Sequence, residues 1–173
     1  MVTRGRTWVS IATVVLLGAL AIAAVPLASP AGAATSKPKP AIRDLAGDFE
    51  GTTSWVYGFP CFVDQSWDAT YTGQHGVGDV TVHLDTCVNL GSGNDADVTG
   101  TFSITTRRGT LTGGLVGTID ITTSVTAFTL TSTGGTGAYT QSTGQQLTFD
   151  ATWTWSDELQ STYPAAGSIG VVT

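Results

Sequence analysis

Apolar and polar residues alternate with a period of two along nearly the whole chain after Gly47, and no useful stretch shows the 3.6-residue period of an amphipathic helix. The alternating inward positions are expected to be, in chain order, Phe49, Thr53, Trp55 and Tyr57; Val63, Gln65, Trp67, Ala69 and Tyr71; Val80, Val82, Leu84 and Val88; Val98, Phe102 and Ile104; Leu111, Leu115, Ile119 and Ile121; Phe128 and Leu130; and Leu147, Phe149, Trp153 and Trp155. A last short strand is expected near Ile169 to Val172. Seven or eight short strands, each with one apolar face, predict an all-β closed antiparallel barrel or a sandwich.

The segment STGGTGAYTQSTG, residues 132–144, is the densest glycine cluster and has two interpretations. A phosphate-binding loop requires a helix directly after its glycines. Here the following residues, from Gln145 to Trp153, alternate as a strand, and no Gly-Lys-Ser/Thr sequence is present. The glycines are therefore expected to permit positive φ and close backbone approach at a barrel corner.

The same segment carries a family resemblance. Gly134-Gly-Thr-Gly-Ala-Tyr139, followed by Gly144, resembles the GG-[TS]-G-x-[FY]-x-x-x-x-G signature of the allene oxide cyclase and dirigent superfamily. Residues 102–114 resemble the strand–turn–strand that precedes this signature, so the resemblance covers about Val98 to Trp155. It implies an eight-stranded, up-and-down-type antiparallel barrel with a ligand cavity, often assembled into homodimers or homotrimers. Similar bacterial barrels include cyclases, but the fold alone does not fix the function.

The first 33 residues have the order of a secretory signal peptide. Arg4 and Arg6 form a basic region, an apolar run extends from Trp8 to Val25, and Ala31-Gly-Ala33 fits a cleavage site. A retained membrane anchor is the alternative, since the apolar run approaches spanning length. Cleavage after Ala33 is favoured and predicts a secreted, extracellular protein. Residues 34–46 are then expected to form a flexible linker, and residues 47–173 the barrel domain.

Charge narrows the range of partners. Removal of Arg4 and Arg6 reduces the basic residues from 7 to 5, and against 13 acidic residues this leaves a net charge of −8. Such a chain cannot neutralise a nucleic-acid backbone, nor is it expected to associate stably with an anionic membrane. No cofactor motif is present, so none is expected.

The two cysteines, Cys61 and Cys87, are expected to form a disulfide in an exported chain, worth about 3 kcal/mol in the chain-entropy model. A reactive thiol is the less favoured alternative. Two cysteines without suitably spaced histidines do not make a zinc site, so no metal is expected.

Pairing Cys61 directly opposite Cys87 raises a conflict about which side chains face inward. This register places Gln65 opposite His83 and brings Asp85 onto the same face, where Gln65, His83 and Asp85 form a candidate acid/base group inside the barrel. The alternation of residues instead places His83 and Asp85 outside, which requires a β-bulge in this hairpin. The bulge is favoured, because a buried His–Asp pair is costly without a role.

Aromatic residues suggest where a ligand would bind. Trp55, Tyr57, Trp67, Tyr71, Trp153 and Trp155 are expected either to pack the core or to line a cavity for a small apolar molecule. Two functions remain open: a cofactor-independent cyclase or isomerase that folds a flexible apolar substrate by orientation, or a non-catalytic secreted binding or structural barrel.

Overall fold

The computed structural model describes residues 42–91, 93–154 and 161–172. The predicted signal peptide, most of the predicted linker and Trp155 lie outside these residues. The described chain contains eight strands: β1 (Gly47–Tyr57), β2 (Val63–Gly73), β3 (Gly78–Leu90), β4 (Asp95–Thr106), β5 (Gly109–Asp120), β6 (Val125–Gly135), β7 (Gln146–Trp153) and β8 (Thr162–Val171). It also contains two 3-10 helices, η1 (Ile42–Leu45) and η2 (Gly137–Tyr139).

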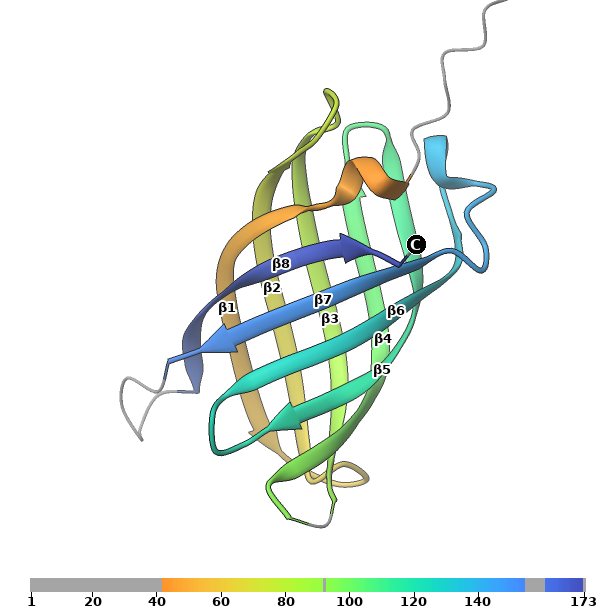
Figure 1. Ribbon diagram of the computed structural model, residues 1–173. Helices are drawn as coiled ribbons and strands as arrows, with labels where there is room; N and C mark the ends of the chain where they lie inside the picture. The colour runs from red at the N-terminus through yellow and green to blue at the C-terminus, as the bar shows by residue number, and fades with distance from the viewer. Residues whose placement is uncertain (1–41, 92, 155–160, 173) are drawn as a thin grey trace, which may run out of the picture. The chain divides into compact units, whose positions relative to one another are not determined.

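The strands form a closed antiparallel barrel in which each pairs with its neighbour in sequence and β1 also pairs with β8 (Figure 1). The predicted all-β, eight-stranded, up-and-down barrel is confirmed, and the sandwich alternative is wrong, because the β1–β8 pairing joins the two ends of a single sheet. Apolar side chains of alternate residues fill the interior, while serine, threonine and aspartate face outward on the other alternate positions.

The last strand is longer than the alternation predicted. β8 begins at Thr162, seven residues before Ile169. Tyr163 and Ala165 face inward, but Ala166 on the outer face is also apolar and Pro164 is a residue that strands disfavour. The period-two signal is therefore weak over this part of the strand.

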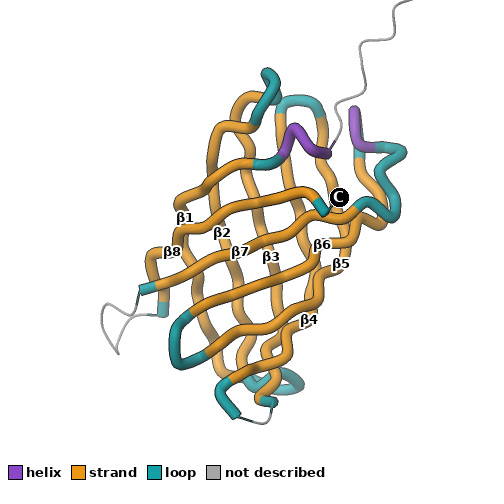
Figure 2. Tube along the Cα trace, in the orientation of Figure 1, coloured by secondary structure: helices purple, strands orange, loops and turns teal. Residues whose placement is uncertain are grey.

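The 3-10 helix η1 lies at one end of the barrel, called here the plug end (Figure 2). Ile42 and Leu45 are buried. The Tyr71 hydroxyl donates a hydrogen bond to the Leu45 main-chain carbonyl, and the Gln74 main-chain N–H donates one to the Asp44 main-chain carbonyl at 3.0 Å. Residues 42–45, which the sequence assigned to the linker, thus pack as part of the barrel domain.

The glycine segment forms the link from β6 to β7, and its first glycines are followed by the three-residue 3-10 helix η2 and then by β7, without the longer helix that a phosphate-binding loop requires. Gly137 has φ +57°, and a Cβ there would lie 2.2 Å from the Arg108 carbonyl oxygen, so both its conformation and its surroundings require glycine. A Cβ at Gly135 would lie 2.5 Å from the Thr110 carbonyl oxygen, whereas one at Gly134 would meet no atom within 4 Å. Tyr139 in η2 is fully buried, and its hydroxyl lies 3.3 Å from Thr106 Oγ1.

Candidate functional site

The β2–β3 hairpin decides where the predicted acid/base residues lie. Gln65 pairs with Thr86, and Asp68 pairs with His83, without a shift of register. The register predicted from the cysteines and the bulge predicted between these strands are therefore both wrong. Cys61 lies in the loop before β2, so it is not one of the paired residues of β2 and β3. It forms the disulfide with Cys87 of β3 from this loop, with a Cα–Cα distance of 5.3 Å. A shift of strand register does occur between β5 and β6, at Thr112 and Gly113, but that hairpin is not the one that carries His83.

His83 and Asp85 lie on the outer wall, so the predicted group of Gln65, His83 and Asp85 does not assemble. His83 instead lies between two carboxylates: its Nδ1 is 2.7 Å from Asp68 Oδ1 and its Nε2 is 3.2 Å from Asp85 Oδ1. All three side chains are 45–68% exposed. The alternation of side chains along β2 gives no sign of a role for Asp68, because only the observed register places Asp68 opposite His83.

The hydrogen bond that protonated His83 donates to Asp68 is the main cause that raises the pKa of His83 above its ordinary value of 6.5, and the charges of Asp68 and Asp85 add to it against partial desolvation. Because protonated His83 is stabilised in the folded state, this contribution is fully present below the unfolded pKa. It is lost as the pH rises through the higher folded pKa.

We expect the stability difference between the native protein and His83→Gln to be largest near pH 5–6 and to disappear in mildly alkaline solution. Urea unfolding from pH 5 to 9 measures this difference. NMR titration is expected to show a larger fall in the pKa of His83 in Asp68→Asn than in Asp85→Asn. An equal fall, or a His83 pKa at or below 6.5 in the native protein, would contradict the assigned cause.

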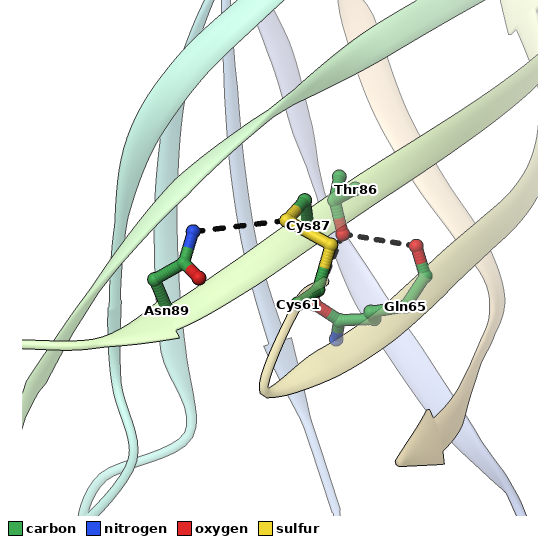
Figure 3. The surroundings of a disulfide bond; sticks show 5 residues. All are labelled: Cys61, Gln65, Thr86, Cys87 and Asn89. Atoms are coloured by element: carbon green, nitrogen blue, oxygen red, sulfur yellow. Dashed lines mark hydrogen bonds between the residues drawn. A yellow bond between two sulfur atoms is a disulfide. The ribbon is translucent and has the colours of Figure 1, made fainter. Parts of the chain in front are cut away.

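Gln65 faces the interior, where its amide is already bonded. Gln65 Nε2 donates a hydrogen bond to Thr53 Oγ1 at 2.9 Å. Thr86 Oγ1 donates one to the Gln65 main-chain carbonyl at 2.9 Å and also lies 3.5 Å from Gln65 Oε1; Gln65 and Thr86 are drawn in Figure 3. Thr53 Oγ1 in turn donates to the Ser66 carbonyl at 3.1 Å. This buried network ties β1, β2 and β3 together, which is a structural role.

The six predicted ligand-lining residues divide into separate places. Trp55, Trp67 and Trp153 come together, with ring centroids 5.4 Å apart for Trp55–Trp153 and 5.8 Å apart for Trp67–Trp153. Tyr57 is 71% exposed at the end of β1, and Tyr71 belongs to the plug end, where burial raises its pKa. Trp155 lies outside the described residues. The barrel end opposite the plug, formed by Thr53, Trp55, Gln65, Thr86, Thr126 and Trp153, is called here the tryptophan end.

Phenylalanines fill the interior between the two ends. Phe149 stacks on Phe49 at 4.9 Å and on Phe128 at 5.7 Å, and its centroid lies 5.4 Å from that of Trp67 in an edge-to-face contact. These rings occupy the middle of the barrel, so Trp67 has a packing role on this side whatever it does at the tryptophan end.

Three polar atoms near the tryptophan end are buried without a hydrogen-bond partner among the described residues: Trp67 Nε1, Trp153 Nε1 and Thr126 Oγ1. Trp67 and Trp153 are in ring contact, and Thr126 lies on β6 beside Ala151, two residues before Trp153 on β7. An unpaired buried donor costs about 1–3 kcal/mol, and for this reason most buried polar groups in proteins are hydrogen-bonded. Three unpaired polar atoms in one region of the barrel are therefore an exception.

Comparison with known proteins found no matching family model, no similar curated protein and no similar solved structure. Within the described part of the chain, no three or more histidine, cysteine, aspartate or glutamate side chains are arranged to hold a metal ion. None of the helices in that part is long and apolar enough to cross a membrane.

Proposed function

We propose that the protein is exported and that its barrel binds a small apolar molecule, carrying a hydrogen-bond acceptor, at the tryptophan end. The observation that carries the proposal is the set of unpaired buried polar atoms on Trp67, Trp153 and Thr126. Small-molecule sites are mostly apolar and contain a few placed polar groups, and indole N–H groups beside aromatic rings supply both. The disulfide between Cys61 and Cys87 is compatible with a compartment outside the cytoplasm.

Binding without turnover is the favoured form of this proposal. His83 and Asp85 face outward, and the Gln65 amide is already engaged. Every described carboxylate and histidine of the eight strands is exposed or half-exposed. The inward faces of the described strands therefore offer tyrosines and neutral hydrogen-bonding groups, which suit orientation of a ligand better than general acid/base catalysis. The buried carboxylate of Asp44 belongs to η1 at the plug end, away from the tryptophan end, and lies 3.1 Å from His75 Nδ1. The resemblance to cyclase barrels keeps an orientation-driven isomerisation as the second candidate.

The experiment titrates purified mature protein with a polyene, a fatty acid, a phenol, and a matched pair consisting of an aryl ketone and the alkylbenzene of the same size. We expect saturable quenching of tryptophan fluorescence, with the ketone preferred over the alkylbenzene. Trp67→Phe keeps a ring but removes the N–H, and is expected to weaken ketone binding about five- to tenfold by calorimetry. Alkylbenzene binding is expected to change little.

Tyr139→Phe is the control, because it removes a hydroxyl at the plug end and should leave ketone binding unchanged. Thr126→Val is expected to stabilise the ligand-free protein by about 0.5–1 kcal/mol, since it replaces an unpaired hydroxyl with a methyl group. Absence of saturable quenching by every compound would leave a purely structural barrel as the better conclusion.

A further inference from the structure

A second candidate site lies on the outer wall, separate from the interior. A groove of about 420 Å³ crosses β1 to β4. Strand register arranges its polar lining in two adjacent rows: Ser54, Ser66, Asp85 and Thr101 in one, and Asp64 with Thr99 in the other. The volume lies in the range of about 300–1,000 Å³ that is typical of small-molecule sites.

An exposed aromatic loop borders this groove. Cys61 in the loop is bonded to Cys87, which lines the groove, and a Cβ on Gly58 would lie 3.4 Å from Asp64 Oδ2. The same loop carries Phe59, which is 97% exposed, and Phe62, which is 48% exposed. Large apolar side chains this exposed beside a polar groove are typical of recognition surfaces rather than of cores.

The wall and the loop together offer two kinds of contact. Serine and threonine hydroxyls both donate and accept hydrogen bonds, and carboxylates accept them, which suits vicinal hydroxyl groups. Aromatic faces suit apolar C–H surfaces. Ser54 Oγ and Ser66 Oγ already form a hydrogen bond of 2.6 Å with each other. A purely apolar ligand would still remove water from the Asp64 carboxylate and the threonine hydroxyls without replacing its hydrogen bonds, and an anionic ligand would be repelled by Asp64, Asp85 and the acidic chain. A cation would use the carboxylates alone, and Asp85 is already paired with His83.

We propose that this groove and its aromatic loop bind a neutral oligosaccharide, with hydroxyl groups toward the two polar rows and a sugar face against the loop. The proposal does not depend on a ligand inside the barrel. The groove is not enclosed and crosses four strands of the outer wall, which suits a segment of a longer glycan chain better than a monosaccharide.

The test measures binding of mature protein to β-1,4-glucan, β-1,3-glucan, chitin, xylan and mannan hexamers by calorimetry and NMR, beside polygalacturonate and spermine. At least one neutral hexamer is expected to bind, and the two charged probes are not. Asp64→Ala and Phe59→Ala are each expected to weaken that binding at least fivefold. Both residues are exposed, so the variants should fold.

Thr101→Val and Thr105→Val form a matched pair, since both residues lie on the outer face of β4 but only Thr101 lines the groove. Thr101→Val is expected to weaken hexamer binding and Thr105→Val to leave it unchanged. Trp67→Phe should also leave it unchanged, which separates this site from the interior one. The proposal is overturned if none of the neutral hexamers binds, if spermine or polygalacturonate is the preferred probe, or if binding is indifferent to all groove variants.

Discussion

Phe149→Ala is expected to lower the free energy of unfolding by about 3–5 kcal/mol, the largest effect of any single substitution considered for this protein. Phe149 is fully buried and contacts Phe49, Phe128 and Trp67 through ring contacts of 4.9–5.7 Å. Truncation removes the transfer free energy of the ring and leaves a cavity that the strands of a closed barrel cannot readily collapse. For a domain of this size, the loss corresponds to a fall in Tm of about 10 °C or more.

Phe59→Ala provides the control, because Phe59 is a phenylalanine with 97% exposure. We expect its free energy of unfolding to stay within about 0.5 kcal/mol of the native value. Urea unfolding followed by far-UV circular dichroism measures both variants. A loss below about 1 kcal/mol in Phe149→Ala would mean that the interior is loosely packed and that the stacked rings contribute little.

Loss of the disulfide is expected to have the next largest effect, about 3 kcal/mol in the double variant Cys61→Ser/Cys87→Ser. The bond spans 26 residues of sequence and fastens the loop before β2 to the outer face of β3. Its removal enlarges the conformational freedom of the unfolded chain, while the β1–β8 closure and the interior packing remain. The barrel should therefore still fold.

Circular dichroism and urea unfolding of the double variant test this expectation. Thiol labelling of the protein without substitutions, denatured but not reduced, should detect no free thiol. The same variant serves the groove proposal, because it releases the aromatic loop and should weaken hexamer binding while ligand binding at the tryptophan end persists. Detection of two free thiols, or unchanged stability in the double variant, would contradict the stabilising role of the disulfide.

Prediction of the candidate sites from sequence succeeded only where side-chain alternation was sufficient. Alternation placed His83 and Asp85 outside and Trp67 and Trp153 inside, as the structure has them. Treating Cys61 as a strand residue directly opposite Cys87 caused the error in register, since a disulfide can also join a loop to a strand. That error hid the pairing of Asp68 with His83.

The sequence by itself determined the all-β class and the inward face of most strands, because the period-two pattern is a local property of each segment. The disulfide partners were also determined, since there are only two cysteines. The tertiary structure alone decided that Tyr71 and Trp153 lie at opposite ends and that Ile42–Leu45 packs at one of those ends. It also decided that polar side chains from four strands line a groove beside the loop of Phe59. These arrangements depend on strand register and barrel closure, which bring together residues far apart in the chain and leave no periodic trace in any one segment.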